Sequence, residues 1–126
     1  MKPNARHILV IDDEPEVRDM LHGFLEEKGF SVTLAMDGIQ AIECIKQDIP
    51  GIIIIDLLLP GEHGINLIKT IKKDYFIPII IISGVYRQEE ISPFMEENFV
   101  EGFIEKPIDL NRLLQSIQSI IDARHV

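Results

Sequence analysis

The sequence predicts an α/β fold in which helices cover both faces of a parallel five-stranded sheet. Short apolar runs alternate with helical apolar stripes along the whole chain. The third run, Gly51-Ile-Ile-Ile-Ile-Asp56, is apolar at consecutive positions, as expected for a strand buried on both faces in a parallel sheet. Five alternating strand and helix units need crossovers that return over the sheet with right-handed sense.

The first half of the chain contains three expected strands. Residues 8–11 predict the first, followed by a helix that begins near Pro15 and closes at Gly29. Residues 31–35 predict the second strand, which leads through Asp37 and Gly38 into a second helix. Residues 52–55 predict the third. The apolar stripes of the two helices are Val17, Met20, Leu21, Phe24 and Leu25, then Ala41, Ile42 and Ile45.

The second half contains two expected strands, residues 79–82 and 100–104. Ser92 as cap and Pro93 at the first helical position predict a short helix, with residues 84–91 as a loop before it. The remaining helices have the stripes Leu67, Ile68 and Ile71, then Leu110, Leu113, Leu114, Ile117, Ile120 and Ile121. Two strand orders fit these units, a flavodoxin-like 2-1-3-4-5 sheet or half of a dinucleotide-binding fold.

Length and charge limit the class of protein. A chain of 126 residues has room for one sizeable core, so we expect a single domain over residues 1–126. The single cysteine, Cys44, fits a reducing compartment, and no apolar run is long enough to span a membrane, so a cytoplasmic location is the expectation. A net charge of -9 argues against binding nucleic acid or an anionic membrane directly.

Polar and charged residues follow four of the five expected strands. Asp12 and Asp13 follow the first strand, Asp56 the third, Ser83 the fourth, and Lys106 stands just after the fifth. In the flavodoxin-like order the first and third strands are neighbours, about 4.8 Å apart. The three acids would then share one small pocket at the carboxyl edge of the sheet, which is the usual ligand-binding edge of such folds.

Such a pocket suits phosphoryl chemistry. Three close carboxylates repel one another unless a cation joins them, and Mg²⁺ prefers oxygen ligands of this kind. Together with Lys106 and the Ser83 hydroxyl, the cation would neutralise and orient a phosphoryl group. A carboxylate in line with the phosphorus, here Asp56, could attack it and form an aspartyl phosphate.

The four motifs together resemble the receiver domain of two-component response regulators. They are Asp12-Asp13, Asp56-Leu-Leu-Leu-Pro-Gly61, Ser83-Gly84 and Lys106-Pro107, and the resemblance extends from about His7 to Ala123. It implies the flavodoxin-like (βα)5 three-layer sandwich. It also implies a signalling domain, rather than an enzyme, that accepts phosphate from a histidine kinase or histidine phosphotransfer protein.

The resemblance implies a role for each matching residue. Asp56 would be the phosphoacceptor, and Asp13, Asp56 and the Leu58 backbone carbonyl would bind Mg²⁺ directly, with Asp12 acting through water. Lys106 would contact the phosphoryl group, and its peptide bond with the following proline would be cis.

Ser83 and Phe103 would be switch residues. They would reset the face formed by the fourth helix, fifth strand and last helix, where an output domain or downstream protein docks. A phosphorylation-dependent homodimer is left open.

Several positions depart from the usual family pattern. His63 precedes Gly64 where an aspartate is common, and Pro93 is expected to shorten the fourth helix. Leu58 and Val85, two residues after Asp56 and Ser83, are apolar at positions that border the path of the hydrolytic water in this family. A long-lived aspartyl phosphate is therefore expected.

Other functions fit the sequence less well. A dinucleotide-binding module would need glycines in the first turn, where Asp12-Asp13-Glu14-Pro15 stands. Many phosphohydrolases with an aspartate nucleophile place an acid at the position of Leu58. A degenerate receiver that binds partners without phosphorylation is the main alternative, and a receiver belonging to a longer regulator is the alternative within the family.

Overall fold

The computed structural model describes residues 4–61 and 63–124 and contains five strands and five helices that alternate along this part of the chain. The elements are β1 (Asn4–Ile11), α1 (Pro15–Glu27), β2 (Ser31–Ala35), α2 (Gly38–Gln47), β3 (Pro50–Asp56), α3 (Gly64–Asp74), β4 (Ile79–Ser83), α4 (Gln88–Asn98), β5 (Gly102–Glu105) and α5 (Leu110–Arg124).

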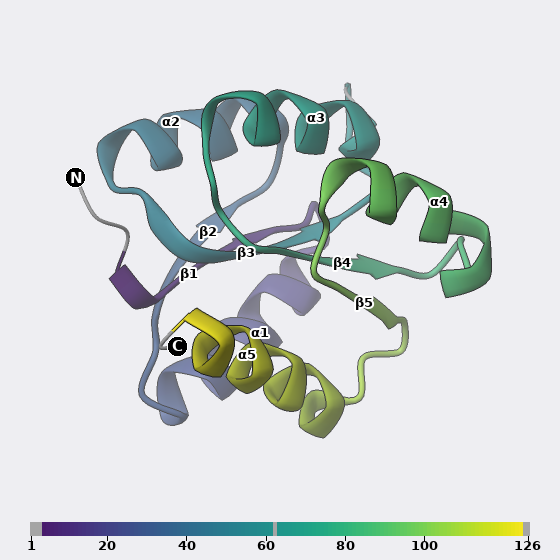
Figure 1. Cartoon of the computed structure of the whole chain (residues 1–126). Coiled ribbons are helices and arrows are strands. Elements are labelled where there is room, and N and C mark those ends of the chain that lie inside the picture. The colour runs from purple at the N-terminus through teal and green to yellow at the C-terminus, as the bar shows by residue number, and fades with distance from the viewer. Residues whose placement is uncertain (1–3, 62, 125–126) are drawn as a thin grey trace.

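The strands form one parallel sheet in the order β2-β1-β3-β4-β5. Figure 1 shows α2, α3 and α4 on one face and α1 and α5 on the other, so the molecule has three layers. The predicted flavodoxin-like order is confirmed. In this order β1 and β3 are neighbours, with Ile11 beside Ile55, so the residues after these two strands lie at the same edge of the sheet.

Two apolar cores lie on the two faces of the sheet. Alternate residues of β3 point to opposite sides, so Ile53 and Ile55 pack under α2 and α3 while Ile52 and Ile54 pack against α1 and α5. Every residue of β3 is buried, which explains the unbroken isoleucine run in the sequence. Burial on both faces fixes the register of the central strand and hence the position of Asp56 at its end.

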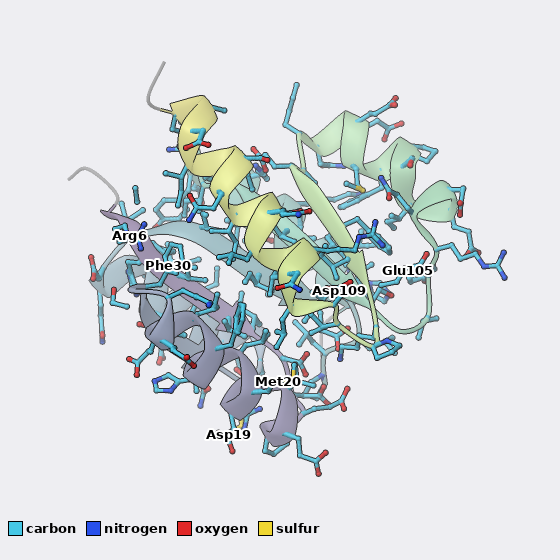
Figure 2. All side chains as sticks on the ribbon, turned by 90° about the horizontal axis from the view of Figure 1, so that it is seen from below. Arg6, Asp19, Met20, Phe30, Glu105 and Asp109 are labelled. Atoms are coloured by element: carbon cyan, nitrogen blue, oxygen red, sulfur yellow. The ribbon has the colours of Figure 1, made fainter. Side chains whose placement is uncertain are left out.

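The face covered by α1 and α5 is seen from below in Figure 2. Near the start of β1, the Arg6 guanidinium lies 4.2 Å from the centroid of the Phe30 ring. Met20 on α1 and Asp109 before α5 mark the end of this face that lies toward the carboxyl edge of the sheet. Within residues 4–61 and 63–124, no helix has the length and apolar content needed to cross a membrane.

The prediction for the fourth helix is wrong. Helix α4 begins at Gln88, not at Ser92, and with Pro93 inside it is as long as α3. The Glu90 carboxylate accepts a hydrogen bond from the Arg87 backbone N–H at 2.9 Å, which fixes the first turn as in a capping box. Ser92 is not the cap; its hydroxyl donates to the Gln88 carbonyl at 2.7 Å.

The bounds of four strands also differ from those expected, and β4 differs only by including Ser83. β5 begins at Gly102 rather than Val100, because the Val100 N–H donates to the Met95 carbonyl and so completes the end of α4. β1 and β3 are longer than expected, and Asn4 pairs with Pro50 beyond the isoleucine run. The predicted bounds of β2 are confirmed, and α1 ends at Glu27 with Gly29, which has a φ of 93°, closing it just beyond as predicted.

Candidate functional site

The predicted convergence of acids at the carboxyl edge is confirmed. Asp12 and Asp56 lie at the ends of neighbouring strands, and one carboxylate oxygen from each of Asp12, Asp13, Glu14 and Asp56 lies within 4.8 Å of the other three. Asp12 and Asp56 are buried, whereas Asp13 and Glu14 are exposed. The cluster therefore has a buried floor and an open rim, and its oxygens could hold a hard cation.

Lys106 faces this cluster from the end of β5. Its Nζ lies 2.7 Å from Asp56 Oδ2, 2.9 Å from Glu14 Oε1 and 3.1 Å from Asp12 Oδ2. Burial works to lower the pKa of this lysine, but the carboxylates of Asp56, Glu14 and Asp12 outweigh it and raise the pKa above the ordinary value. Lys106 is therefore a fixed positive charge beside Asp56.

Asp12 has a different electrostatic environment. Its side chain is fully buried, and this burial raises the pKa of the carboxyl, with a further contribution from the negative charge of Asp56. The Glu14 N–H donates to Asp12 Oδ1 at 2.8 Å, whereas Oδ2 has no hydrogen-bond partner although the Lys106 amine is near. A buried carboxylate oxygen without a hydrogen bond is costly, and a bound hydrated cation would remove that cost.

The loop after Asp56 is held against the start of α3. The Leu58 N–H donates to Asp56 Oδ1 at 3.0 Å, and the Gly64 N–H donates to the Leu57 carbonyl at 2.8 Å. A Cβ on Gly64 would lie 2.6 Å from Leu57 Cα, so only glycine fits there. His63 replaces the more common aspartate as the cap, because its Nδ1 accepts the Ile65 N–H at 3.1 Å.

A cavity of about 290 Å³ opens beside the acids. It is lined by Asp13, Glu14, Asp56, Leu58, Gly84, Val85 and Lys106. Leu58 and Val85, the two apolar positions singled out in the sequence, are both exposed and lie on its wall. The cavity therefore combines acids, an amine and an apolar side.

The two candidate switch residues are buried. The Ser83 hydroxyl oxygen accepts the Val85 and Tyr86 N–H groups at 3.1 and 3.0 Å, so its own proton is free to be donated elsewhere. The Phe103 ring packs beneath α4 in the core that contains Met95.

The structure also identifies contributors that the sequence did not single out. Glu14 binds Lys106 and belongs to the acidic cluster, and its position directly after Asp13 was the available signal. The Arg18 guanidinium donates to the Asp12 backbone carbonyl at 2.7 Å, which fixes the loop that presents Asp12 and Asp13. Only the folded chain reveals this contact. The expected cis peptide between Lys106 and Pro107 is confirmed.

Comparison with known families agrees with this arrangement. The family model described as the response regulator receiver domain matches residues 8–118. The chain belongs to this family. It is therefore a receiver domain of the two-component response regulator type, and the sequence resemblance is confirmed.

Solved receiver structures have the same fold. A two-component response regulator from Clostridium difficile is 27% identical, with a TM-score of 0.89 over 95% of this chain and 98% of that chain. A CheY-like receiver domain protein from Methanospirillum hungatei JF-1 is 26% identical, with a TM-score of 0.85 over 94% and 95% of the two chains. NtrX from Brucella abortus is 29% identical, with a TM-score of 0.83 over 94% of this receiver but only 28% of its own chain.

Proposed function

We propose that this receiver accepts a phosphoryl group on Asp56 from a histidine kinase or a histidine phosphotransfer protein in a Mg²⁺-dependent reaction. The observation that carries the proposal is the contact of 2.7 Å between Asp56 Oδ2 and Lys106 Nζ in the cavity that Asp13 and Glu14 also line. A lysine held there by three carboxylates supplies positive charge where a phosphoryl group would bind.

In the proposed step an Asp56 carboxylate oxygen attacks the phosphorus of the phosphohistidine. The new P–O bond forms as the P–N bond breaks, and the electron pair of that bond stays on the ring nitrogen of the donor histidine. Lys106 offsets the negative charge on the phosphoryl oxygens, and the Leu58 N–H holds the Asp56 carboxylate in place.

The acidic cluster fits a bound Mg²⁺. Asp13, Asp56 and the Leu58 backbone carbonyl would be its direct ligands, and Asp12 would act through a water molecule. Support comes from the carboxylate oxygens within 4.8 Å of one another and from the buried Asp12 oxygen that lacks a hydrogen bond. When bound, Mg²⁺ supplies positive charge for the carboxylates and for the phosphoryl oxygens.

The response would pass to the face formed by α4, β5 and α5. The Ser83 proton is available for a phosphoryl oxygen, and the Ser83 hydroxyl oxygen accepts the backbone N–H groups of Val85 and Tyr86, in the segment that leads into α4. Phe103 lies between that helix and a cavity of about 660 Å³ on the β5 and α5 side. A change at this ring would alter a surface on which an output domain or downstream protein docks.

The proposal treats residues 1–126 as one receiver domain, which is consistent with the single sheet and with the family match over residues 8–118. The cytoplasmic location and the phosphorylation-dependent homodimer stay predictions.

Incubation with acetyl phosphate and Mg²⁺, followed by intact mass measurement, tests the proposal. The wild-type protein should gain the mass of one phosphoryl group, and Asp56→Asn should gain none. Asp19→Asn, which changes an exposed acid on α1, is the matched control and should be labelled like the wild type. An unlabelled wild-type protein, under conditions that label a known receiver, would favour the degenerate receiver instead.

A further inference from the structure

Two loops form the apolar wall of the cavity beside Asp56. The loop after β3 supplies Leu58, and the loop after β4 supplies Gly84 and Val85. Residues 57–61, 63 and 84–87 belong to no helix or strand, so the hydrogen bonds of the sheet do not fix this wall. Its shape depends on other contacts that hold the two loops in place.

His63 and Tyr86 bring the two loops into contact. His63 directly precedes α3, and Tyr86 lies two residues before the start of α4. Their ring centroids are 6.3 Å apart and the ring planes make an angle of 65°, which is an edge-to-face arrangement. Aromatic pairs in this geometry attract one another beyond the area that they bury. Both residues are half-buried, and Tyr86 also packs against the core on the α2, α3 and α4 face.

The imidazole of His63 is fixed on the side of the loop after β3. Its Nδ1 accepts the Ile65 N–H at 3.1 Å, which requires this nitrogen to be unprotonated. The next residue, Gly64, donates its N–H to the Leu57 carbonyl at 2.8 Å. The position of the His63 ring is therefore linked, through the first turn of α3, to the loop that contains Leu58.

Tyr86 is linked to Ser83 on the other side of the ring pair. Its backbone N–H donates to the Ser83 hydroxyl oxygen at 3.0 Å, beside the Val85 N–H at 3.1 Å. The proton of the same hydroxyl is the one proposed for a phosphoryl oxygen on Asp56. The ring pair therefore connects the acceptor loop with both Ser83 and the apolar residue Val85.

Capping alone does not account for a histidine at residue 63. Asparagine, aspartate, serine and threonine are the preferred caps of a helix N-terminus, and none of them has a ring. Histidine supplies an acceptor for the Ile65 N–H and also a ring that contacts Tyr86. Because different substitutions remove the acceptor and the ring, the two contributions can be separated.

We propose that His63 and Tyr86 are positioning residues that hold the two loops together and thereby keep water from a phosphoryl group on Asp56. The proposal rests on the function proposed above. In the decay of an aspartyl phosphate, a water oxygen attacks the phosphorus as the bond to the Asp56 oxygen breaks. The electron pair stays on the carboxylate, and a water proton passes to solvent. With the rings in contact, Leu58 and Val85 stay close and restrict this water.

Amide hydrogen exchange of the unphosphorylated protein tests the contact itself. Tyr86→Leu should speed exchange in residues 57–61, and His63→Asn should speed exchange in residues 84–87, although each change lies outside the segment that is measured. Loss of an aromatic pair should raise the open fraction of each loop by about twofold to tenfold. Leucine keeps the apolar packing of residue 86, and circular dichroism checks that both variants are folded.

Decay of the phosphorylated protein after removal of acetyl phosphate tests the effect on water. His63→Asn keeps an oxygen that can cap α3 but removes the ring, and it should shorten the lifetime by about twofold to tenfold. His63→Phe removes the cap but keeps a ring, so it should retain the wild-type lifetime while unfolding at a lower urea concentration. Tyr86→Phe should also retain the lifetime. A residue that only stabilised α3 would give the opposite order.

Two further variants complete the test. Combining His63→Asn with Tyr86→Leu should shorten the lifetime no more than Tyr86→Leu alone, because both changes remove the same contact.

Phe76→Asn is the matched control. Phe76 is 95% exposed and lies before β4 at the amino edge of the sheet, opposite the edge that carries Asp56. The cavity at the amino edge has a volume of about 460 Å³ and is lined by Lys72, Tyr75, Phe76, Phe99, Glu101 and Arg124. None of these residues lines the cavity beside Asp56, so removal of the Phe76 ring should change neither exchange nor lifetime.

The two proposals can fail separately. Unchanged exchange in both loops overturns the positioning role, as does a phosphorylated His63→Asn protein that decays at the wild-type rate. A wild-type protein that acetyl phosphate never labels overturns the proposed function instead. The exchange measurement would still decide whether the two rings hold the loops together.

Discussion

The two edges of the sheet carry opposite kinds of surface. At the carboxyl edge, buried carboxylates face a lysine, and Asp12 keeps an oxygen without a hydrogen bond. At the amino edge, the charged groups are paired or bonded to backbone, and the exposed groups are the rings of Phe76 and Phe99. The carboxyl edge has one carboxylate oxygen without a hydrogen bond, and the amino edge has exposed apolar area.

This difference indicates what each edge binds. A buried carboxylate oxygen without a hydrogen bond, such as Asp12 Oδ2, is stabilised by a small cation, whereas exposed rings are stabilised by another apolar surface. The cavities at the two edges share no lining residue, so changes at one edge should leave the other unaffected.

The largest expected effect is at the carboxyl edge. Lys106→Ala should slow phosphorylation by acetyl phosphate about 100-fold or more, because it removes the positive charge that faces the phosphoryl oxygens. A time course of intact mass measures the rate. Lys73→Ala, which removes an exposed lysine of α3, should react at the wild-type rate. A loss of only a few fold for Lys106→Ala would contradict the role of the lysine.

Mg²⁺ should stabilise the folded protein. At a concentration about 100 times its dissociation constant, it should raise the free energy of unfolding by about 2.7 kcal/mol, since it binds the folded acidic cluster. Thermal melts with Mg²⁺ and with EDTA measure the effect. Asp13→Asn should weaken it and Asp122→Asn should not. Equal melting temperatures in the two buffers would argue against the metal site.

Leu58 and Val85, which form the apolar wall of the cavity beside Asp56, should set the lifetime of the aspartyl phosphate. Leu58→Asn should shorten this lifetime by roughly tenfold, less than a positioned proton-transfer group achieves, because an amide can hold a water molecule near the phosphorus. Loss of the phosphorylated mass after removal of acetyl phosphate measures the decay. A wild-type decay already faster than that of receivers with polar residues there would contradict the predicted long lifetime.

The smallest expected effect is at the amino edge. Phe99→Gly should raise the free energy of unfolding by about 0.5 kcal/mol. Phe99 ends α4 with a φ of 56°, and relief of this left-handed strain exceeds the extra entropy that glycine gives the unfolded chain. Urea denaturation measures the difference. A clear loss of stability would show that the ring packs usefully within the chain.

The sequence predicts the carboxyl edge far better than the amino edge. Parallel strands end at a common edge, so Asp12, Asp56 and Lys106 could be brought together from strand order alone. The exposure of Phe76 and Phe99 depends on how the ends of α3 and α4 meet the sheet, which no local pattern encodes. From the sequence alone, an apolar residue directly after a helix could equally well be buried in the core.

The error at α4 has a local cause. Ser92-Pro93 is a strong start signal, because a proline as the sixth residue of a helix removes an i to i−4 backbone hydrogen bond and is usually avoided there. The Glu90 carboxylate stabilises an earlier start at Gln88, and Arg87 is not a residue type that marks a cap. Residue types alone do not show whether the capping interaction or the proline decides where the helix begins.

Gly64 has a practical consequence for engineering. Because its amide binds the Leu57 carbonyl and its Cα has no room for a side chain, the loop that shapes the acceptor is closed by the first turn of α3. Anyone who transplants this acceptor loop into another parallel sheet must move that helical turn with it. A graft that ends at Gly61 would contain Asp56 but would lack the hydrogen bond from the Gly64 N–H to the Leu57 carbonyl, which holds the loop in place.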